Sequence, residues 1–118
     1  MYPKYFKDKI FEELNASYEY LKKALDSMKS YPEWTEKFKS MSDDRYKNAL
    51  TLYAMFMRFY KDSKNQDTYI NSIRDNIIEN FTAQMQKIES YRITYDLMMN
   101  PSDSKEEVII NGRSITDE

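Results

Sequence analysis

Residues Trp34 to Tyr60 read WTEKFKSMSDDRYKNALTLYAMFMRFY, and this stretch decides the fold. Its large apolar side chains are spaced three and four residues apart in turn, which is the period of one face of an α-helix. They are Trp34, Phe38, Met41, Leu52, Met55 and Phe59. The spacing predicts one long helix over residues 31–60 with this stripe as its apolar seam. Because Ser42-Asp43-Asp44 also resembles a helix N-cap, a kink or break there is the alternative.

Two polar residues, Arg45 and Asn48, stand in the middle of that seam. They are three residues apart, so they project from the same helix face. After them the apolar face widens beyond the stripe of an ordinary surface helix. Burial of the extra area would drive assembly, so we expect the segment to be central in a bundle or to lie in a subunit interface. The candidate interface residues in this segment are Leu50, Tyr53, Phe56, Met57 and Tyr60.

The first helix is predicted over residues 4–29. Its stripe consists of Phe11, Leu14, Tyr18, Leu21, Leu25 and Met28. A second row lies beside it and contains Ile10, Glu13, Ser17, Tyr20 and Ala24. Glu13 therefore stands at the border of the buried face, and its alternative placement is on the flank with its carboxylate in solvent.

The third helix is predicted from Asp67 or Thr68 to about Met99, after the polar loop KDSKNQ. Its stripe consists of Ile70, Ile73, Ile77, Phe81, Gln84, Ile88, Tyr91, Tyr95 and Met98. A single polar residue, Gln84, interrupts the middle of the stripe. Asn100-Pro101 ends the helix.

A short connection, Ser30-Tyr31-Pro32-Glu33, joins the first two helices. Ser30 and Glu33 have the spacing of a capping box, and Pro32 suits the first turn of a helix. A connection this short implies antiparallel neighbours. The predicted fold class is therefore all-α, with residues 1–100 forming an antiparallel bundle of three long helices.

Residues 101–118 (PSDSKEEVIINGRSITDE) differ in kind and hold the only glycine of the chain. Asn111-Gly112 between β-branched runs predicts a β-hairpin, and a disordered acidic tail is the alternative. A hairpin alone is marginally stable in water, so we expect it to dock on the bundle, on a neighbouring subunit or on a partner's sheet edge. The contact residues would be Val108, Ile109, Ile110 and Ile115.

The composition limits the chemistry that is available to a single domain of 118 residues. Without cysteine there is no disulfide framework and no thiolate metal site, and without histidine there is no imidazole catalysis and no His-ligated metal or haem. We therefore expect neither an enzyme nor a cofactor.

The net charge is −2, and residues 101–118 contribute −3 of it, which leaves residues 1–100 near +1. The lysines are interleaved with acids, so we expect no nucleic-acid partner. No apolar run has the length of a membrane span and the N-terminus lacks the apolar core of a signal peptide, so we expect no membrane partner. The expected location is the cytoplasm, or a virion into which the protein is assembled.

Residues 11–25, FEELNASYEYLKKAL, resemble the first helix of the ferritin-like superfamily, in which a Glu is followed by an A-S-Y-x-Y-L segment. Here these are Glu13 and the segment Ala16 to Leu21. Residues 34–52 resemble the second helix of the family, in which a Phe, a Ser and an acidic run lead into E-x-x-H-A and a Leu. When the sequences are aligned on Ala49, the Glu of the family falls on Arg45 and its His on Asn48.

The departures from the family pattern concern its metal ligands. In the family, carboxylates and His bind a di-iron centre in the bundle core. Here Glu13 remains, but a cation and an amide stand at Arg45 and Asn48, and a second family Glu falls on Gln84. Residues 101–118 are too few for a full fourth helix that carries another E-x-x-H. The resemblance therefore implies a ferritin-like hairpin, extended by a third helix, that has lost its metal.

We interpret the substituted positions as one polar layer inside the bundle. Glu13, Arg45 and Gln84 stand at similar depths along their helices, so Arg45 can take the place of the metal as the cation that neutralises Glu13. The predicted layer contains Glu13, Tyr20, Arg45, Asn48 and Gln84. Alternatively, Arg45 extends to solvent and only its stem covers apolar surface.

The function that fits best is that of a non-catalytic helical interaction or structural protein. It would be a small subunit of a larger assembly, such as a phage virion or connector, with a protein partner or self-association. The alternative is a ferritin-like carboxylate metal-binding protein or oxidase, with Glu13, Asp44 and Glu79 as ligands. Adjacent acids such as Asp43-Asp44 do not share a helix face, so they form no ready-made chelate.

Overall fold

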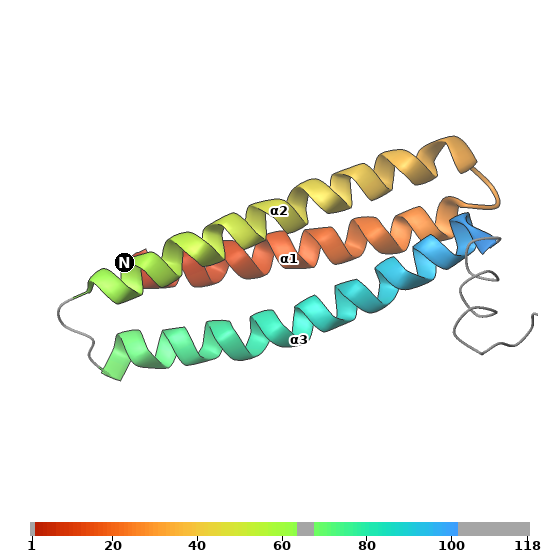
Figure 1. The fold of residues 1–118 in the computed structure, drawn as a ribbon. Coiled ribbons are helices and arrows are strands. Elements are labelled where there is room, and N and C mark those ends of the chain that lie inside the picture. Colours follow the sequence, from red (N-terminus) through yellow and green to blue (C-terminus); the bar gives the residue numbers. More distant parts are fainter. Residues whose placement is uncertain (1, 64–67, 102–118) are drawn as a thin grey trace, which may run out of the picture.

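The structure, a computed structural model, describes residues 2–63 and 68–101. It contains the helices α1 (Tyr2–Ser27), α2 (Pro32–Asp62) and α3 (Thr68–Met99), with no strand in the described part. The helices run up, down and up, and α1 lies between α2 and α3 (Figure 1). The predicted all-α bundle of three long helices is confirmed. The predicted hairpin around Asn111-Gly112 and its contact residues lie outside the described residues.

Helix α1 can be central because both of its rows of side chains have a neighbour. Phe6 meets Phe56 of α2, with ring centroids 5.9 Å apart. Tyr18, from the stripe predicted as the seam of α1, meets Tyr91 of α3 at 5.1 Å. Two adjacent rows therefore serve two adjacent helices. Four residues at the centre of α1, Ile10, Leu14, Leu21 and Ala24, have no exposed surface at all.

The contact between α1 and α2 is built on small side chains. The Ser17 hydroxyl donates to the backbone carbonyl of Ser42 at 2.9 Å, and the Ser42 hydroxyl donates to the carbonyl of Ser17 at 2.7 Å. This reciprocal pair is fully buried. Near the connection, the hydroxyls of Ser27 and Thr35 are 3.0 Å apart. Short hydroxyl side chains let the two backbones approach closely and satisfy their own polar atoms on the facing helix.

The buried face of α2 differs from the predicted seam by one position. The buried residues are Thr35, Ser42, Tyr46, Ala49 and Phe56. Three members of the predicted stripe are instead exposed: Trp34 (45%), Met41 (41%) and Met55 (51%). The prediction placed the large apolar side chains in the interface. In the structure, small residues such as Thr35, Ser42 and Ala49 lie there, because they let the two helices pack closely. A pattern of hydrophobic residues does not identify them. Helix α2 also continues through Ser42 without the break considered as the alternative.

The start of α2 corrects a second prediction. Tyr31 is the N-cap residue, and no side chain hydrogen-bonds the first turn. Ser30 and Glu33 therefore form no capping box. Pro32 begins the helix as predicted, because its missing N–H needs no partner in the first turn. The backbone N–H of Tyr31 instead donates to the carbonyl of Ser27 at 2.8 Å, which closes the end of α1.

Helix α3 buries most of its predicted stripe. Its buried residues are Ile73, Ile77, Phe81, Ile88 and Tyr95, whereas Met98 at its C-terminal end is exposed. Among the described residues, no helix combines the length and the apolar character that a bilayer crossing requires.

The wide apolar face of α2 packs largely inside the bundle, which is the first of the two placements expected for it. Phe56 has no exposed surface. Tyr53 stacks on Phe81 of α3 with centroids 4.2 Å apart, and the Tyr60 hydroxyl donates to Oδ1 of Asn71 at 2.6 Å. Met57 is half-buried against the core. Phe56, Tyr53 and Tyr60 contact neighbouring helices of the same chain, and of the predicted α2 set only Leu50 is exposed.

Candidate functional site

A buried carboxylate lies between the two helices of the hairpin, at Glu13 of α1. Arg45 of α2 donates from Nη1 to both carboxylate oxygens, at 3.3 Å to Oε1 and 3.2 Å to Oε2. Asn48 donates from Nδ2 to Oε1 at 3.3 Å. The spacing of one helical turn on α2 brings both donors to the same carboxylate.

The two charged partners differ in their exposure to solvent. The side chain of Glu13 is 8% exposed, and that of Arg45 is 41% exposed. A carboxylate taken out of water without a partner is costly, and Arg45 neutralises it from the rim while it keeps contact with solvent. Each of the two sequence interpretations of Arg45 is therefore correct in part. Its guanidinium pairs with Glu13, and its side chain also extends to solvent.

Tyr20 and Gln84 are not part of this group, which corrects the predicted five-residue layer. Tyr20 stacks on Phe38 at a centroid distance of 6.4 Å and makes no hydrogen bond to Glu13. The Oε1 atom of Gln84 is buried without a hydrogen-bond partner. Helix α3 packs on α1 beside the row that holds Tyr18, whereas Glu13 is in the row that meets α2. Glu13 and Gln84 stand at similar depths along their helices, but they lie in different helix–helix interfaces.

The three acidic residues of the alternative metal site are Glu13, Asp44 and Glu79, and the described residues give them no common site. Among residues 2–63 and 68–101, no three Asp or Glu side chains gather closely enough to hold a metal ion. Asp44 and Glu79, proposed as ligands with Glu13, are both exposed. Glu13 itself faces the guanidinium of Arg45, whose positive charge would repel a metal cation. The donor set that a di-iron centre needs is therefore absent from this layer.

A second polar cluster, which the sequence analysis missed, joins α2 to α3. The Asp43 carboxylate accepts from Lys39 at 2.9 Å and from the Arg92 guanidinium of α3. Burial alone would raise the pKa of Asp43, but the hydrogen bonds and charges of Lys39 and Arg92 outweigh it and hold that pKa below its ordinary value. The guanidinium of Arg92 also lies over the Tyr46 ring, 4.6 Å from its centroid. Only the i, i+4 spacing of Lys39 and Asp43 was visible in the sequence.

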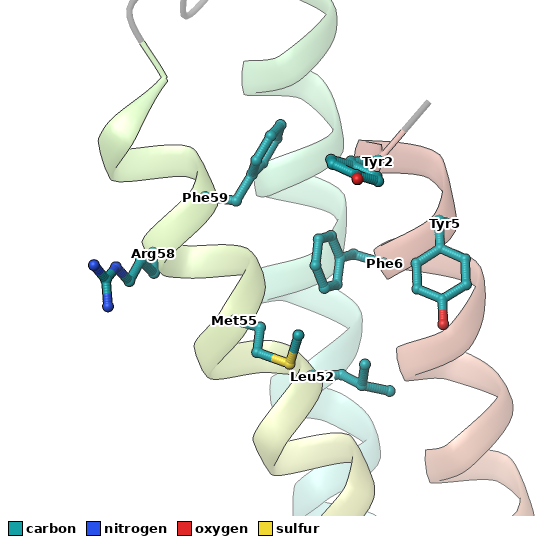
Figure 2. Close-up of a pocket in the computed structure, with 7 residues that line it drawn as sticks. All are labelled: Tyr2, Tyr5, Phe6, Leu52, Met55, Arg58 and Phe59. Atoms are coloured by element: carbon teal, nitrogen blue, oxygen red, sulfur yellow. The ribbon is translucent and has the colours of Figure 1, made fainter.

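The side chains of the predicted stripe lie along one side of α2 and are exposed or half-buried, and we call this side the outer face. Its members are Trp34, Phe38, Met41, Arg45, Asn48, Leu52, Met55 and Phe59. At one end it opens into a pocket of about 520 Å³ between α1 and α2. Figure 2 shows Leu52, Met55 and Phe59 of α2 around this pocket with Tyr2, Tyr5 and Phe6 of α1, and α3 lies behind them. The pocket therefore opens on the side of the hairpin that α3 leaves uncovered.

The other end of the outer face is also apolar. Trp34, Phe38 and Met41 line a shallow hollow together with Lys37. Trp34 stacks on Tyr31 with ring centroids 4.0 Å apart, and it meets Phe38 edge-on at 6.5 Å. Between the two apolar ends lie Arg45 and Asn48, which hold Glu13. The outer face thus has an apolar, polar, apolar order along its length.

Comparisons with protein-family models, with curated proteins and with solved structures give no match to this chain. The ferritin-like relationship therefore stays a prediction that rests on the residues quoted for it.

Proposed function

We propose that this protein is a non-catalytic helical interaction protein, a small subunit of a larger assembly, and that it binds its partner through the outer face. One observation carries the proposal: three large apolar side chains, Trp34, Met41 and Met55, are exposed on one face of the same helix. Single exposed apolar residues are common on protein surfaces, but exposed apolar side chains that border apolar hollows along one helix face are typical of an interaction site.

The polar groups between the helices support a structural role. Arg45 and Asn48 are engaged with Glu13, and Lys39 and Arg92 are engaged with Asp43. In each cluster the cations compensate a carboxylate, which is the arrangement of a structural ion pair rather than of an acid and a base prepared for proton transfer. The pocket beside Met55 is lined by apolar and aromatic groups, with Arg58 at its edge.

The ferritin-like resemblance supports the same proposal. In it, Arg45 stands where a metal ligand stands in the family, and here its guanidinium neutralises Glu13. A hairpin that exchanged its metal for an internal ion pair retains the packing of the bundle and loses the redox chemistry. The assembly that we propose is a virion or connector in which this chain is one of several small subunits, with the cytoplasm as the location of the unassembled protein.

The experiment that tests this proposal compares outer-face variants in pull-downs from the native source. Met55→Glu adds a charge at the centre of the apolar end of the outer face. Ile93→Glu is the matched control, because Ile93 of α3 is similarly exposed, at 58%. We expect the wild type and Ile93→Glu to retain the same partner chain, whether another copy or a different protein, and Met55→Glu to lose it. Equal retention by all three proteins contradicts the proposal, as does tight stoichiometric Fe, Mn or Zn in the purified protein.

A further inference from the structure

We propose that the partner on the outer face is a second copy of this chain, docked with its α2 antiparallel to the first. This inference rests on the proposed function and names the occupant of the same face. It follows from the symmetry of the face, from its polar centre and from its charges.

The outer face is complementary to itself under a two-fold rotation. Its members lie at equal distances on either side of a point midway between Tyr46 and Lys47. The pairs related in this way are Trp34 with Phe59, Phe38 with Met55, Met41 with Leu52, and Arg45 with Asn48. If two α2 helices cross antiparallel about this point, every apolar residue meets an apolar residue and the polar pair meets the polar pair. A dimer with two-fold symmetry requires a self-complementary surface of this kind.

The spacing of the face suits packing between two helices. Alternate steps of three and four residues are the a and d positions of a coiled coil, in which each side chain enters a hole on the facing helix. The two-fold rotation brings Trp34 and Phe38 of one copy over Phe59 and Met55 of the other. These latter residues line the pocket of about 520 Å³, so large aromatic side chains meet an apolar hollow at both ends of the dimer.

The polar centre fixes the register. Arg45 reaches Glu13 with Nη1, and Asn48 uses Nδ2 for the same carboxylate. Asn48 therefore presents its Oδ1 as an acceptor, and Arg45 has further N–H donors on a side chain that is 41% exposed. In the antiparallel register Arg45 of one copy faces Asn48 of the other. A shift by one heptad in either direction would place the guanidinium against Met55 or Met41, and a polar residue at such a position specifies register.

The charges permit this arrangement. Two Arg45 side chains approach each other near the axis, but each is neutralised by Glu13 of its own copy at 3.2 Å. The central layer of the dimer carries two carboxylates and two guanidinium groups, so it has no net charge. Like charges therefore do not oppose the contact, and the hydrogen-bonding groups of the layer have partners.

The area of a stable dimer requires the adjoining surface of α1 as well as the outer face. The stripe from Trp34 to Phe59 is about 38 Å long at ~1.5 Å per residue, and one helix is about 10 Å wide, so the outer face alone measures about 380 Å². Tyr2 and Tyr5 of α1 line the pocket beside Met55 and are 64% and 53% exposed, so they extend the apolar surface beyond α2. With both helices of the hairpin the surface reaches about 760 Å² on each copy, close to the ~800 Å² per partner of a standard specific interface.

The first test measures the oligomeric state of the full chain by sedimentation. We expect the wild type and Ile93→Glu to sediment as dimers at about 100 µM, and Met55→Glu to sediment as a monomer. Circular dichroism of each variant checks that its helices are intact, which is expected because residue 55 is half exposed in the monomer. A monomeric wild type, or a dimer that survives Met55→Glu, overturns the inference.

The second test determines the relative orientation of the two α2 helices. Because the chain has no cysteine, the introduced thiols have no native thiol to react with. In the antiparallel dimer position 38 of one copy faces position 55 of the other, so a mixture of Phe38→Cys and Met55→Cys chains forms mixed disulfides under oxidation. Met55→Cys alone should not cross-link. Its two sulfurs are 17 positions apart along the dimer, or about 25 Å. Efficient cross-linking of Met55→Cys alone, or none in the mixture, overturns the antiparallel arrangement.

The two proposals can fail separately. If the wild type is a monomer and the pull-downs show a different protein that Met55→Glu loses, the second copy is wrong and the interaction function stands. If Met55→Glu changes neither the sedimentation nor the retained proteins, both fail.

Discussion

Glu13 of α1 and Arg45 of α2 form an ion pair in which the carboxylate is buried and the guanidinium stands at the rim. Because of this difference in burial, removal of the two partners should lower the free energy of unfolding by unequal amounts. Arg45 can turn to water when Glu13 is neutralised. When Arg45 is removed, the Glu13 carboxylate cannot turn to water in the same way, because it is enclosed between α1 and α2.

We therefore predict unequal effects of the two single substitutions on stability. Glu13→Gln should lower the free energy of unfolding by about 1 kcal/mol, because the amide retains part of the hydrogen bonding. Arg45→Met should lower it by about 2–3 kcal/mol, because a buried carboxylate loses its counter-charge. Urea unfolding monitored by circular dichroism measures both values.

The double substitution Glu13→Leu with Arg45→Met is the control for this ion pair. It removes both charges together, so it should be more stable than Arg45→Met alone. If Arg45→Met alone matches the wild type, the pair has no structural weight and the argument from asymmetry is wrong.

Ser42 carries the second prediction, because its hydroxyl is fully buried between α1 and α2 and donates to the carbonyl of Ser17. Ser42→Ala keeps the small volume and loses one hydrogen bond, so it should cost about 1 kcal/mol. Ser42→Leu inserts a large side chain at a fully buried position and should cost 3 kcal/mol or more by forcing the helices apart. Ser40→Leu, an exposed site on the same helix, is the matched control for the effect of leucine itself. Equal melting temperatures for Ser42→Leu and Ser40→Leu would show that the helices do not touch there.

The fold could be predicted from the sequence because long helices with few breakers leave little choice. The stripe of α3 was predicted well, since Ile73, Ile77 and Phe81 are large and their period is regular. The seam of α2 was wrong by one position, since Thr35 and Ser42 are buried for their small size. That property is common to many exposed residues, so a pattern of apolar side chains does not reveal it.

The candidate site was predictable only in part, and for a similar reason. Arg45 and Asn48 interrupt an apolar stripe, and that interruption pointed to Glu13 before the structure did. The contact of Asp43 with Arg92 joins residues that are far apart in sequence and depends on the rotation of α3 about its axis. Periodicity places a residue on a face, but it does not fix which neighbour that face meets. The same limit put Gln84 into the layer of Glu13 by mistake.

The third prediction concerns pH and Asp43. Its pKa is lower in the folded chain than in the unfolded chain, because Lys39 and Arg92 outweigh the opposing effect of burial. A depressed pKa stabilises the fold above the unfolded pKa of about 3.9, and this contribution is lost as the pH falls through the folded value. The wild type should therefore lose stability below about pH 5, and Asp43→Asn should lose less over that range.

The expected size of this effect is small. The Asp43 side chain is 38% exposed, so solvent screening limits its contribution to about 1 kcal/mol or less. Asp44→Asn, at an exposed neighbouring position, is the control for the removal of one negative charge from α2. Thermal melts at intervals between pH 3 and pH 7 make the comparison. Identical pH curves for Asp43→Asn and the wild type would mean that Lys39 and Arg92 do not hold the carboxylate in solution.

The last prediction is a stabilising substitution at Gln84. Its Oε1 atom is buried without a hydrogen-bond partner, and such an atom costs about 1–3 kcal/mol relative to one in water. Gln84→Leu removes the unpaired oxygen, keeps a similar length and places a strong helix former in the apolar stripe of α3. We expect the free energy of unfolding to rise by about 1 kcal/mol. Gln86→Leu, at an exposed position two residues on, is the control for helix propensity and should change it by less than about 0.5 kcal/mol. If Gln84→Leu destabilises the chain instead, the amide has a hydrogen-bond partner in solution.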